Sequence, residues 1–121
     1  MNLMNWVCML SKNYRLRLKN DFDRLFKEGK FAGHAFLTLG FAKNNLNNSR
    51  FAVIVAKKVS KKAVKRNSIK RKIVEIIRLD LQQIKPGFDL VFIAKPEIQG
   101  KKYKEIKAAV SGLLKRARFI E

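Results

Sequence analysis

The sequence predicts a single-domain α+β fold, an α/β sandwich in which three helices pack on a small sheet of about four strands. Short apolar runs that suit strands alternate with longer stretches whose apolar residues recur every three or four positions. The chain has 121 residues, of which 47% are hydrophobic, which is enough for one domain with one core. No internal repeat or low-complexity tract divides it. The expected order of elements is α-β-β-β-α-β-α.

The first helix is predicted from about Asp21 to Glu28. Asn20 or Asp21 can cap it by accepting a backbone N–H bond. Three apolar residues spaced i, i+3, i+4 would share one face of this helix: Phe22, Leu25 and Phe26. Gly29 is expected to end the helix by taking the left-handed conformation.

The strands are predicted from apolar and β-branched runs. Residues from Phe31 to Ala42 form either one strand or two short strands separated near Gly33. An Asn-rich turn follows from Lys43 to Ser49. Phe51 to Ala56 is continuously apolar, so we expect a central strand buried on both faces. A last strand runs from Phe88 to Ala94, after the turn at Pro86 and Gly87 and before Pro96.

A long amphipathic helix is predicted to begin between Lys61 and Lys65 and to end near Ile84. Five isoleucines make its inner stripe: Ile69, Ile73, Ile76, Ile77 and Ile84. The polar face carries Asn67, Arg71 and Arg78, with Lys70 on the flank. The final helix is predicted from Lys101 to Phe119, with an inner stripe formed by Tyr103, Ile106, Val110, Leu113, Leu114 and Ala117.

Positive charge dominates the chain and is concentrated around the start of the long helix. There are 28 Lys and Arg residues against 9 Asp and Glu residues, a formal net charge of +19. Glu75 is the only acid among ten basic residues: Lys57, Lys58, Lys61, Lys62, Lys65, Arg66, Lys70, Arg71, Lys72 and Arg78. Because the chain supplies no carboxylates to neutralise this cluster, we expect a polyanionic partner, and nucleic acid is the foremost one.

Other functional classes find little support in the residues. His34 and Cys8 are the only residues of their types, the acids are scattered, and the sequence around Gly29 lacks the ending of a P-loop. No stretch reaches the ~20 apolar residues needed to span a bilayer. A single cysteine suits a reducing cytoplasm. Residues 1–14 are expected to form a poorly ordered or loosely packed extension, and residues 15–121 the RNA-binding domain.

The basic segment resembles the signature of the bacterial ribonuclease P protein subunit. In that family a valine-rich strand leads to a Ser-Lys-Lys or Ala-Lys-Lys step and then to Ala-Val-x-Arg-Asn-Arg-x-Lys-Arg. Residues 56–58 (Ala-Lys-Lys) and 63–71 (Ala-Val-Lys-Arg-Asn-Ser-Ile-Lys-Arg) match this order. The resemblance continues upstream through Arg17-Leu18, Phe22 and residues 26–29, and downstream through residues 88–95. It covers about residues 15–116.

This resemblance implies a subunit of an endoribonuclease whose chemistry is carried out by a catalytic RNA. That RNA, with Mg²⁺ that it mainly holds itself, removes the 5′ leader from precursor tRNA in the cytoplasm. The protein would bind the catalytic RNA and the single-stranded leader, as a monomer in a 1:1 ribonucleoprotein. The family fold further implies a left-handed strand-helix-strand crossover, against the usual right-handed rule.

The resemblance also assigns residues to two surfaces, and neither includes catalytic or metal-binding residues. The surface for the catalytic RNA comprises Lys57, Lys58, Lys61, Lys62, Lys65, Arg66, Asn67, Lys70, Arg71 and Arg78. The leader-binding cleft comprises Arg15, Arg17, Phe22, Phe26 and Phe36. Three positions depart from the family pattern: Ser68 and Val74 stand where arginines are usual, and Leu39 where some members have a cleft tyrosine.

Several roles stay open at the level of the residues. Asn67 can bind a sugar hydroxyl, a base edge or the backbone of its own loop, and each phenylalanine can belong to the core. A general RNA-binding or ribosomal protein with no processing role has the same composition as a ribonuclease P subunit. An enzyme acting alone on RNA is disfavoured by the missing catalytic cluster. A membrane-surface role is disfavoured because the apolar stripe of the long helix suits a core.

Overall fold

The computed structural model describes Leu16 and residues 19–120, and the elements predicted from the sequence occur there in the expected order. They are α2 (Lys19–Glu28), β1 (Lys30–Gly33), β2 (Leu37–Lys43), β3 (Arg50–Ile54), α3 (Ala63–Asp80), β4 (Phe88–Ala94) and α4 (Tyr103–Arg116). Two 3-10 turns, η2 (Leu81–Gln83) and η3 (Pro96–Ile98), follow α3 and β4. The predicted extension at residues 1–14, and Arg15 and Arg17, lie outside the described residues.

The four strands form one mixed sheet in the order β1-β2-β4-β3. β1 and β2, and β2 and β4, pair antiparallel, whereas β3 and β4 pair parallel and are joined through α3. The structure therefore confirms the α+β class with a four-stranded sheet. The left-handed sense of the crossover stays a prediction.

The prediction that β3 is a central strand is wrong, because β3 lies at an edge of the sheet and β4 lies inside it. Phe51 is nevertheless buried. Beyond the sheet, the backbone N–H of Leu16 donates to the Phe51 carbonyl over 2.8 Å. A continuous apolar run indicates that both faces of a strand are covered by other parts of the protein. It does not indicate whether the strand has neighbouring strands on both of its edges.

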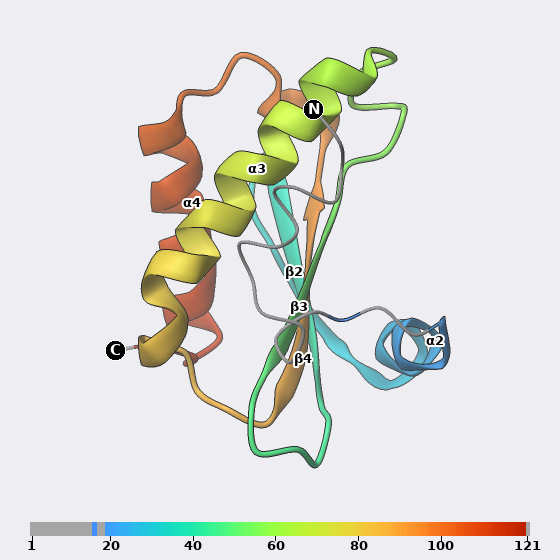
Figure 1. Cartoon of the computed structure of the whole chain (residues 1–121), viewed down its shortest axis with the longest axis vertical. Coiled ribbons are helices and arrows are strands. Elements are labelled where there is room, and N and C mark those ends of the chain that lie inside the picture. The colour runs from blue at the N-terminus through green and yellow to red at the C-terminus, as the bar shows by residue number, and fades with distance from the viewer. Residues whose placement is uncertain (1–15, 17–18, 121) are drawn as a thin grey trace.

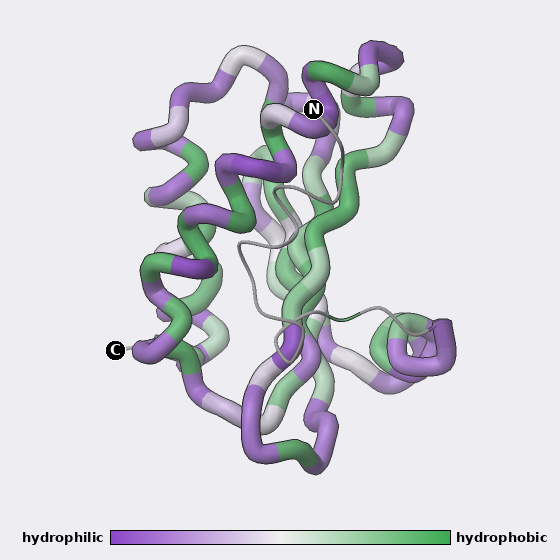
Figure 2. Tube along the Cα trace, viewed as in Figure 1, coloured by the Kyte–Doolittle hydropathy of each residue, from purple (hydrophilic) through white to green (hydrophobic). Residues whose placement is uncertain are grey.

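Helices cover the two faces of the sheet unequally. Figure 1 shows α3 and α4 on one side of the strands and α2 on the other. The larger core lies on the α3 and α4 side and contains Leu39 and Phe92, which are register partners in β2 and β4. A smaller cluster of Leu16, Leu25 and Val91 lies on the α2 side. Figure 2 shows the hydrophobic residues gathered along the strands between these layers.

The inner stripes predicted for the two long helices are confirmed in their central members. All five isoleucines of the first stripe are buried, but α3 ends at Asp80, earlier than predicted, so Ile84 lies after η2 and outside the helix. In α4 the buried members are Ile106, Val110, Leu113 and Leu114, whereas Tyr103 and Ala117 are half-buried. Val74 is buried as well and belongs to the larger core. The position at which the family commonly has an arginine is thus an interior position of α3 in this chain.

Gly29 ends α2 for a different reason from the predicted one. Positive φ angles occur, among the described glycines, only at Gly87 and Gly100. A Cβ atom on Gly29 would lie 2.3 Å from the Leu25 carbonyl oxygen and 2.9 Å from that of Phe41. Glycine is needed here because the end of α2 lies against the backbone of β2. Gly29 does not adopt the left-handed conformation that was predicted for it.

Candidate nucleic-acid interface

The basic segment between β3 and α3 is held in a fixed shape by one buried residue. Val59 is fully buried in the larger core, and its N–H donates to the Ala56 carbonyl over 3.0 Å in a tight turn. Lys57 and Lys58 precede this anchor in the chain and are exposed. The turn therefore exposes Lys57 and Lys58 while Val59 packs into the core.

Arg66 connects the turn to the first residues of α3. Its Nη1 donates to the Ser60 carbonyl over 2.8 Å, and the Lys62 N–H donates to Ser60 Oγ over 3.2 Å. Arg66 was predicted to bind RNA, and in the structure its bond to the Ser60 carbonyl also stabilises the turn. One nitrogen of its guanidinium, Nη1, therefore already donates a hydrogen bond to the protein backbone.

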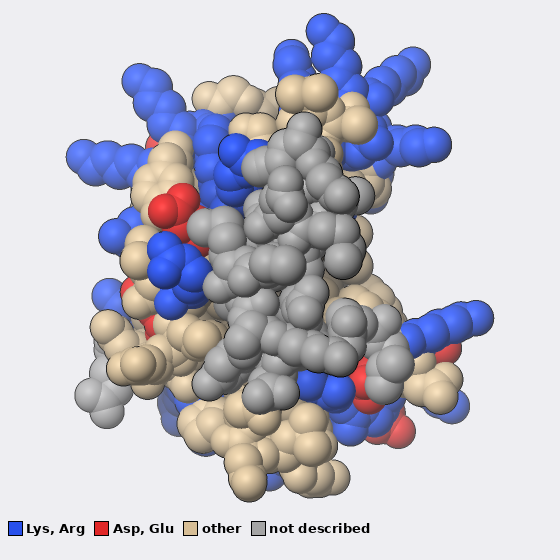
Figure 3. All heavy atoms as spheres, viewed as in Figure 1, with Lys and Arg blue, Asp and Glu red and all other residues tan. Residues whose placement is uncertain are grey.

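The N-terminus of α3 has the features of an anion-binding site. The N-cap residue Lys62 makes no side-chain cap, and the first turn contains no acidic residue. Free N–H groups and the positive end of the helix dipole therefore coincide with lysine charges. Five exposed lysines surround this point, and we call them the basic surface: Lys57, Lys58, Lys61, Lys62 and Lys65. They contribute to the blue spheres at the top right of Figure 3.

The remaining predicted residues follow the outer side of α3. Arg71 and Arg78 are exposed, whereas Asn67 and Lys70 are half-buried. Burial lowers the pKa of Lys70 from its usual value, and the positive charge of Arg66 lowers it further. The side chain of Asn67 makes no hydrogen bond to another described residue. The structure therefore does not support the alternative in which Asn67 bonds the backbone of its own loop. Ser68 is exposed beside these residues.

The aromatic residues predicted to share one cleft lie on opposite faces of the sheet. Phe22 packs against the smaller cluster on the α2 side. Phe36 is 7% exposed and belongs to the larger core on the other side, where His34 meets its ring edge-on at 4.6 Å. Phe36 is therefore a core residue, and its grouping with Phe22 and Phe26 is not supported. The error arises because Phe36 precedes β2 in a bend, where alternation does not assign a face.

The exposed aromatic pair on the α2 side is formed by Phe26 and Phe31, and Phe36 is not part of it. Phe26 is 47% exposed and Phe31 is 46% exposed, and their rings stack with centroids 6.0 Å apart. A Cβ atom on Gly40 would lie 2.6 Å from the Phe31 ring, so the absence of a side chain there lets Phe31 lie flat on β2. The sequence offered one signal for this pair, a glycine inside a strand, which often marks a close approach.

The face of the sheet beside this pair carries half-buried aliphatic residues. Ile54 and Ile93 are register partners in β3 and β4, and both pack against the smaller cluster. Leu39, considered as the cleft position on β2, is fully buried on the opposite face. Its neighbour Thr38, the register partner of Ile93, occupies the α2 face. The α2 face thus presents Phe22, Thr38 and the two isoleucines between α2 and the start of α3.

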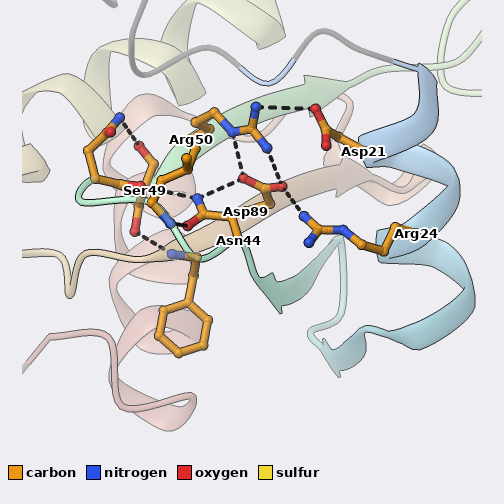
Figure 4. A network of polar contacts seen from close by, with 9 residues as sticks. Asp21, Arg24, Asn44, Ser49, Arg50 and Asp89 are labelled. Atoms are coloured by element: carbon orange, nitrogen blue, oxygen red, sulfur yellow. Dashed lines mark hydrogen bonds and ion pairs between the residues drawn. The ribbon is translucent and has the colours of Figure 1, made fainter.

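A buried carboxylate fixes α2 on the sheet, and the sequence analysis did not identify it. Asp89 is fully buried in β4. It accepts two bonds from Arg50, at 2.9 Å and 2.8 Å, and one from Arg24 of α2 at 2.8 Å (Figure 4). Asn44 Nδ2 donates to it over 3.0 Å, and Asp21 of α2 lies 3.2 Å from Arg50 Nη1. These carboxylates raise the pKa of Arg50 against the effect of burial.

This network positions the aromatic residues of α2. Arg24 lies between Phe22 and Phe26 in the sequence of α2, so the ion pair to β4 sets the rotation of the helix about its axis. An acid inside an otherwise apolar strand was the available signal, because a buried carboxylate requires partners. Its partners come from three other parts of the chain, and no local pattern in the sequence identifies them.

The described residues, Leu16 and 19–120, contain neither a cluster suited to a metal ion nor a helix suited to a membrane. No group of three or more His, Cys, Asp or Glu side chains that could hold a metal ion occurs among them. Within the same part of the chain, no helix is long and apolar enough to cross a membrane.

Comparison with known proteins places this arrangement in a family. Residues 10–118 match the family Ribonuclease P. The Ribonuclease P protein component of Clostridium novyi is 42% identical over 110 residues, which cover 89% of this chain and 96% of the relative. That of Clostridioides difficile is 37% identical over 102 residues, with 84% and 89% covered.

Solved structures agree with the sequence relatives. The RNase P protein from Thermotoga maritima superposes with a TM-score of 0.77 at 35% identity, covering 84% of this chain and 96% of its own. The Staphylococcus aureus RNase P protein gives 0.83 at 27% identity, covering 89% and 98%. With the order of the strand, the double lysine and the Arg-Asn helix, these matches show that the chain belongs to the ribonuclease P protein family.

Proposed function

We propose that this chain, a protein subunit of ribonuclease P, binds the catalytic RNA through the basic surface and the outer side of α3. The observation that carries the proposal is the placement of five exposed lysines around an uncapped helix N-terminus, on a turn anchored by the buried Val59. Lysines act there as point charges, and Arg71 on the next turns is suited to bidentate contact with a phosphate.

The α2 face is the proposed binding surface for the single-stranded 5′ leader of precursor tRNA. Phe26 and Phe31 expose nearly half of their surfaces, and Phe22 adds a half-buried ring on the same side. Stacking of unpaired bases on such rings contributes about 1–3 kcal/mol per base. Mature tRNA has no leader, so this surface would favour the precursor over the product.

The chemistry in this proposal belongs to the RNA and to the Mg²⁺ that the RNA mainly holds. The chain contributes charge, because its formal +19 offsets the mutual repulsion of RNA phosphates and so favours the compact, magnesium-bound state. The working assembly is one protein to one catalytic RNA, acting on precursor tRNA in the cytoplasm.

The first test is cleavage of precursor tRNA by the cognate catalytic RNA at low Mg²⁺, with and without the protein. Restored cleavage at the correct 5′ position is the expected result. Tight RNA binding without any change in cleavage would instead favour a general RNA-binding protein. Cleavage by the protein in the absence of catalytic RNA would favour an enzyme that acts alone.

Two variants separate the two proposed surfaces. Arg71→Ala should weaken assembly with the catalytic RNA, whereas Phe31→Ala should weaken binding of precursor tRNA and leave leaderless tRNA unaffected. Lys107→Gln, on the exposed side of α4, is the control for a lost charge. Equal losses for precursor and leaderless tRNA in the Phe31 variant would refute the assignment of the leader to the α2 face.

A further inference from the structure

A second basic site lies at the opposite end of α3 from the basic surface. Lys85, Lys115 and Arg118, together with Gln83, Phe119 and Ile120, line a hollow of about 650 Å³. The three cations come from the turn before β4, from the last turn of α4 and from the residues after α4. We call this the C-terminal basic hollow. Figure 1 shows the C-terminal ends of α3 and α4 close together at the lower left of the view, away from the start of α3 at the top.

The backbone of Arg118 is in a conformation that usually calls for glycine. Its φ is 66°, and Asn45 is the only other non-glycine residue with positive φ in the part of the chain described. The Phe119 N–H donates to the Leu114 carbonyl over 2.8 Å and the Arg118 N–H to the Lys115 carbonyl over 3.0 Å, which is a Schellman motif with Arg118 at its left-handed position. An arginine is strained there, and such strain often marks a functional residue.

Contacts within the protein join the two walls of the hollow. The Lys85 N–H donates to the Phe119 carbonyl over 2.9 Å. The Phe119 ring is buried and meets the rings of Phe41 and Phe88 edge-on, with centroids 5.1 Å and 5.0 Å away. Lys85 Nζ lies 5.6 Å from the centre of the Phe88 ring. The segments that carry Lys85 and Arg118 are therefore held next to each other by contacts within the protein itself.

None of the ion pairs between described residues joins Lys85, Lys115 or Arg118 to a carboxylate. The helix dipole accounts for a base such as Lys115 in the last turn of α4. It does not account for Lys85, which lies on a separate segment, nor for an arginine kept where glycine would relieve strain. Three cations that line one hollow suit a bound phosphate group.

We propose that the C-terminal basic hollow binds the sugar-phosphate backbone of RNA in the ribonucleoprotein, as a contact separate from the basic surface. The inference rests on the proposed function, since it assigns a further contact to the same RNA-bound state. α3 has 18 residues and is about 27 Å long, so the two sites would contact RNA segments about one helix length apart.

The test variant is Arg118→Gly, because strain and RNA binding predict opposite effects. Glycine relieves the left-handed strain, so the midpoint of thermal unfolding should rise. Affinity for the ribonuclease P RNA should nevertheless fall about 3- to 10-fold. The dependence of log affinity on log salt should become shallower by about 0.7 to 0.9, the value for one phosphate contact. Lys107→Gln, which removes one charge elsewhere on α4, is the matched control.

Lys85→Gln provides a second variant with no backbone strain to relieve. Loss of affinity and a shallower salt slope in both hollow variants, beyond those of Lys107→Gln, would support the site. Affinities and slopes equal to those of the control in both variants would overturn it.

A tethered probe tests the location independently of affinity. Gln83→Cys in a Cys8→Ser background allows iron–EDTA to be attached beside the hollow, and Lys61→Cys allows the same at the basic surface. Cleavage of the catalytic RNA at two different sets of nucleotides is expected, and cleavage only from position 61 would refute the inference. The wild-type cleavage assay is the separate check on the proposed function, because stimulation of cleavage by wild type does not depend on the hollow.

Discussion

At the scale of single residues, Lys70 shows a conflict between stability and binding. Its ammonium is half-buried beside Arg66, and both burial and this neighbour lower its pKa. Lys70→Met should therefore raise the free energy of unfolding of the free protein while weakening binding of the catalytic RNA. Urea denaturation and an RNA binding titration, each compared with Lys107→Gln, measure the two effects. A variant that binds RNA as well as wild type does would contradict the assignment.

The pH dependence of this effect has a defined sign. The pKa of Lys70 in the folded state lies below its unfolded value, so the unfolded state binds more protons between the two values. Stability of wild type relative to Lys70→Met should then rise with pH in the window that ends near 10.5. The raised pKa of Tyr103 acts in the opposite direction at alkaline pH, but it is common to both proteins and cancels in the difference.

Asp89 is expected to be the most sensitive polar residue of the fold. Removing its carboxylate leaves Arg50 and Arg24 without their shared partner against the sheet. Asp89→Ala should lower the free energy of unfolding by about 2–4 kcal/mol, as measured by urea denaturation. Asp21→Asn, which weakens only the more exposed contact to Arg50, should cost less than about 1 kcal/mol. Similar losses for the two variants would argue against this network.

The residue scale also shows what the sequence could predict of the site. The exposure of Arg71 and Arg78 was predicted correctly because the isoleucine stripe sets the rotation of the helix, and their contact with RNA stays a prediction. Phe36 was placed in the cleft although it lies in the core, and no face was predicted for Phe31, because each lies where the alternation of a short strand starts or stops. Their faces depend on which strand the chain pairs with next, and on the glycine that admits the Phe31 ring.

At the scale of elements, α4 contains a glycine that its environment does not require. A Cβ atom on Gly112 would meet nothing within 4 Å. Gly112→Ala should raise the free energy of unfolding by about 0.5–1 kcal/mol, because alanine loses less backbone entropy in a helix. Thermal or urea denaturation measures this change, which should leave RNA binding unaltered.

Gly100 is the matched control for that substitution. Its added Cβ would also meet nothing within 4 Å, but its φ is +80°. Gly100→Ala should therefore destabilise the protein, since alanine is strained in this conformation. The opposite signs would establish that backbone conformation, and not available space, decides the outcome at both positions. Stabilisation by both substitutions would contradict this explanation.

The order of the elements was predictable, whereas the order of strands in the sheet was not. Each helix and strand has a local pattern, such as the apolar run of β4 between Gly87 and Pro96. The placement of β4 between β2 and β3 depends on contacts between residues far apart in the chain. Local patterns hold no record of such pairing, and so β3 was mistaken for an inner strand.

At the scale of the whole molecule, the net charge of +19 makes stability depend on anions. Charges of one sign repel each other in the compact state, and salt screens this repulsion. Raising NaCl should increase the midpoint of thermal unfolding of the free protein. Micromolar inorganic polyphosphate should raise the midpoint further, because binding to the folded state adds about 2.7 kcal/mol to the free energy of unfolding at one hundred times the dissociation constant.

The control for this prediction is the same titration in the presence of bound catalytic RNA. With the charge already compensated, polyphosphate should add little to the stability of the ribonucleoprotein. A free protein whose unfolding midpoint is insensitive to both NaCl and polyphosphate would show that self-repulsion is unimportant.

The position of β4 has a consequence for synthesis on the ribosome. Among the strands that the structure describes, β3 pairs only with β4, whose first residue, Phe88, is added 34 residues after Ile54. At about 5–20 residues per second, β3 and the lysines that follow it emerge seconds before the strand that fixes them. The nascent chain therefore cannot present the finished RNA-binding surface until nearly all of its sequence is translated. We therefore expect the proposed contact with the catalytic RNA to form after β4 has paired with β3.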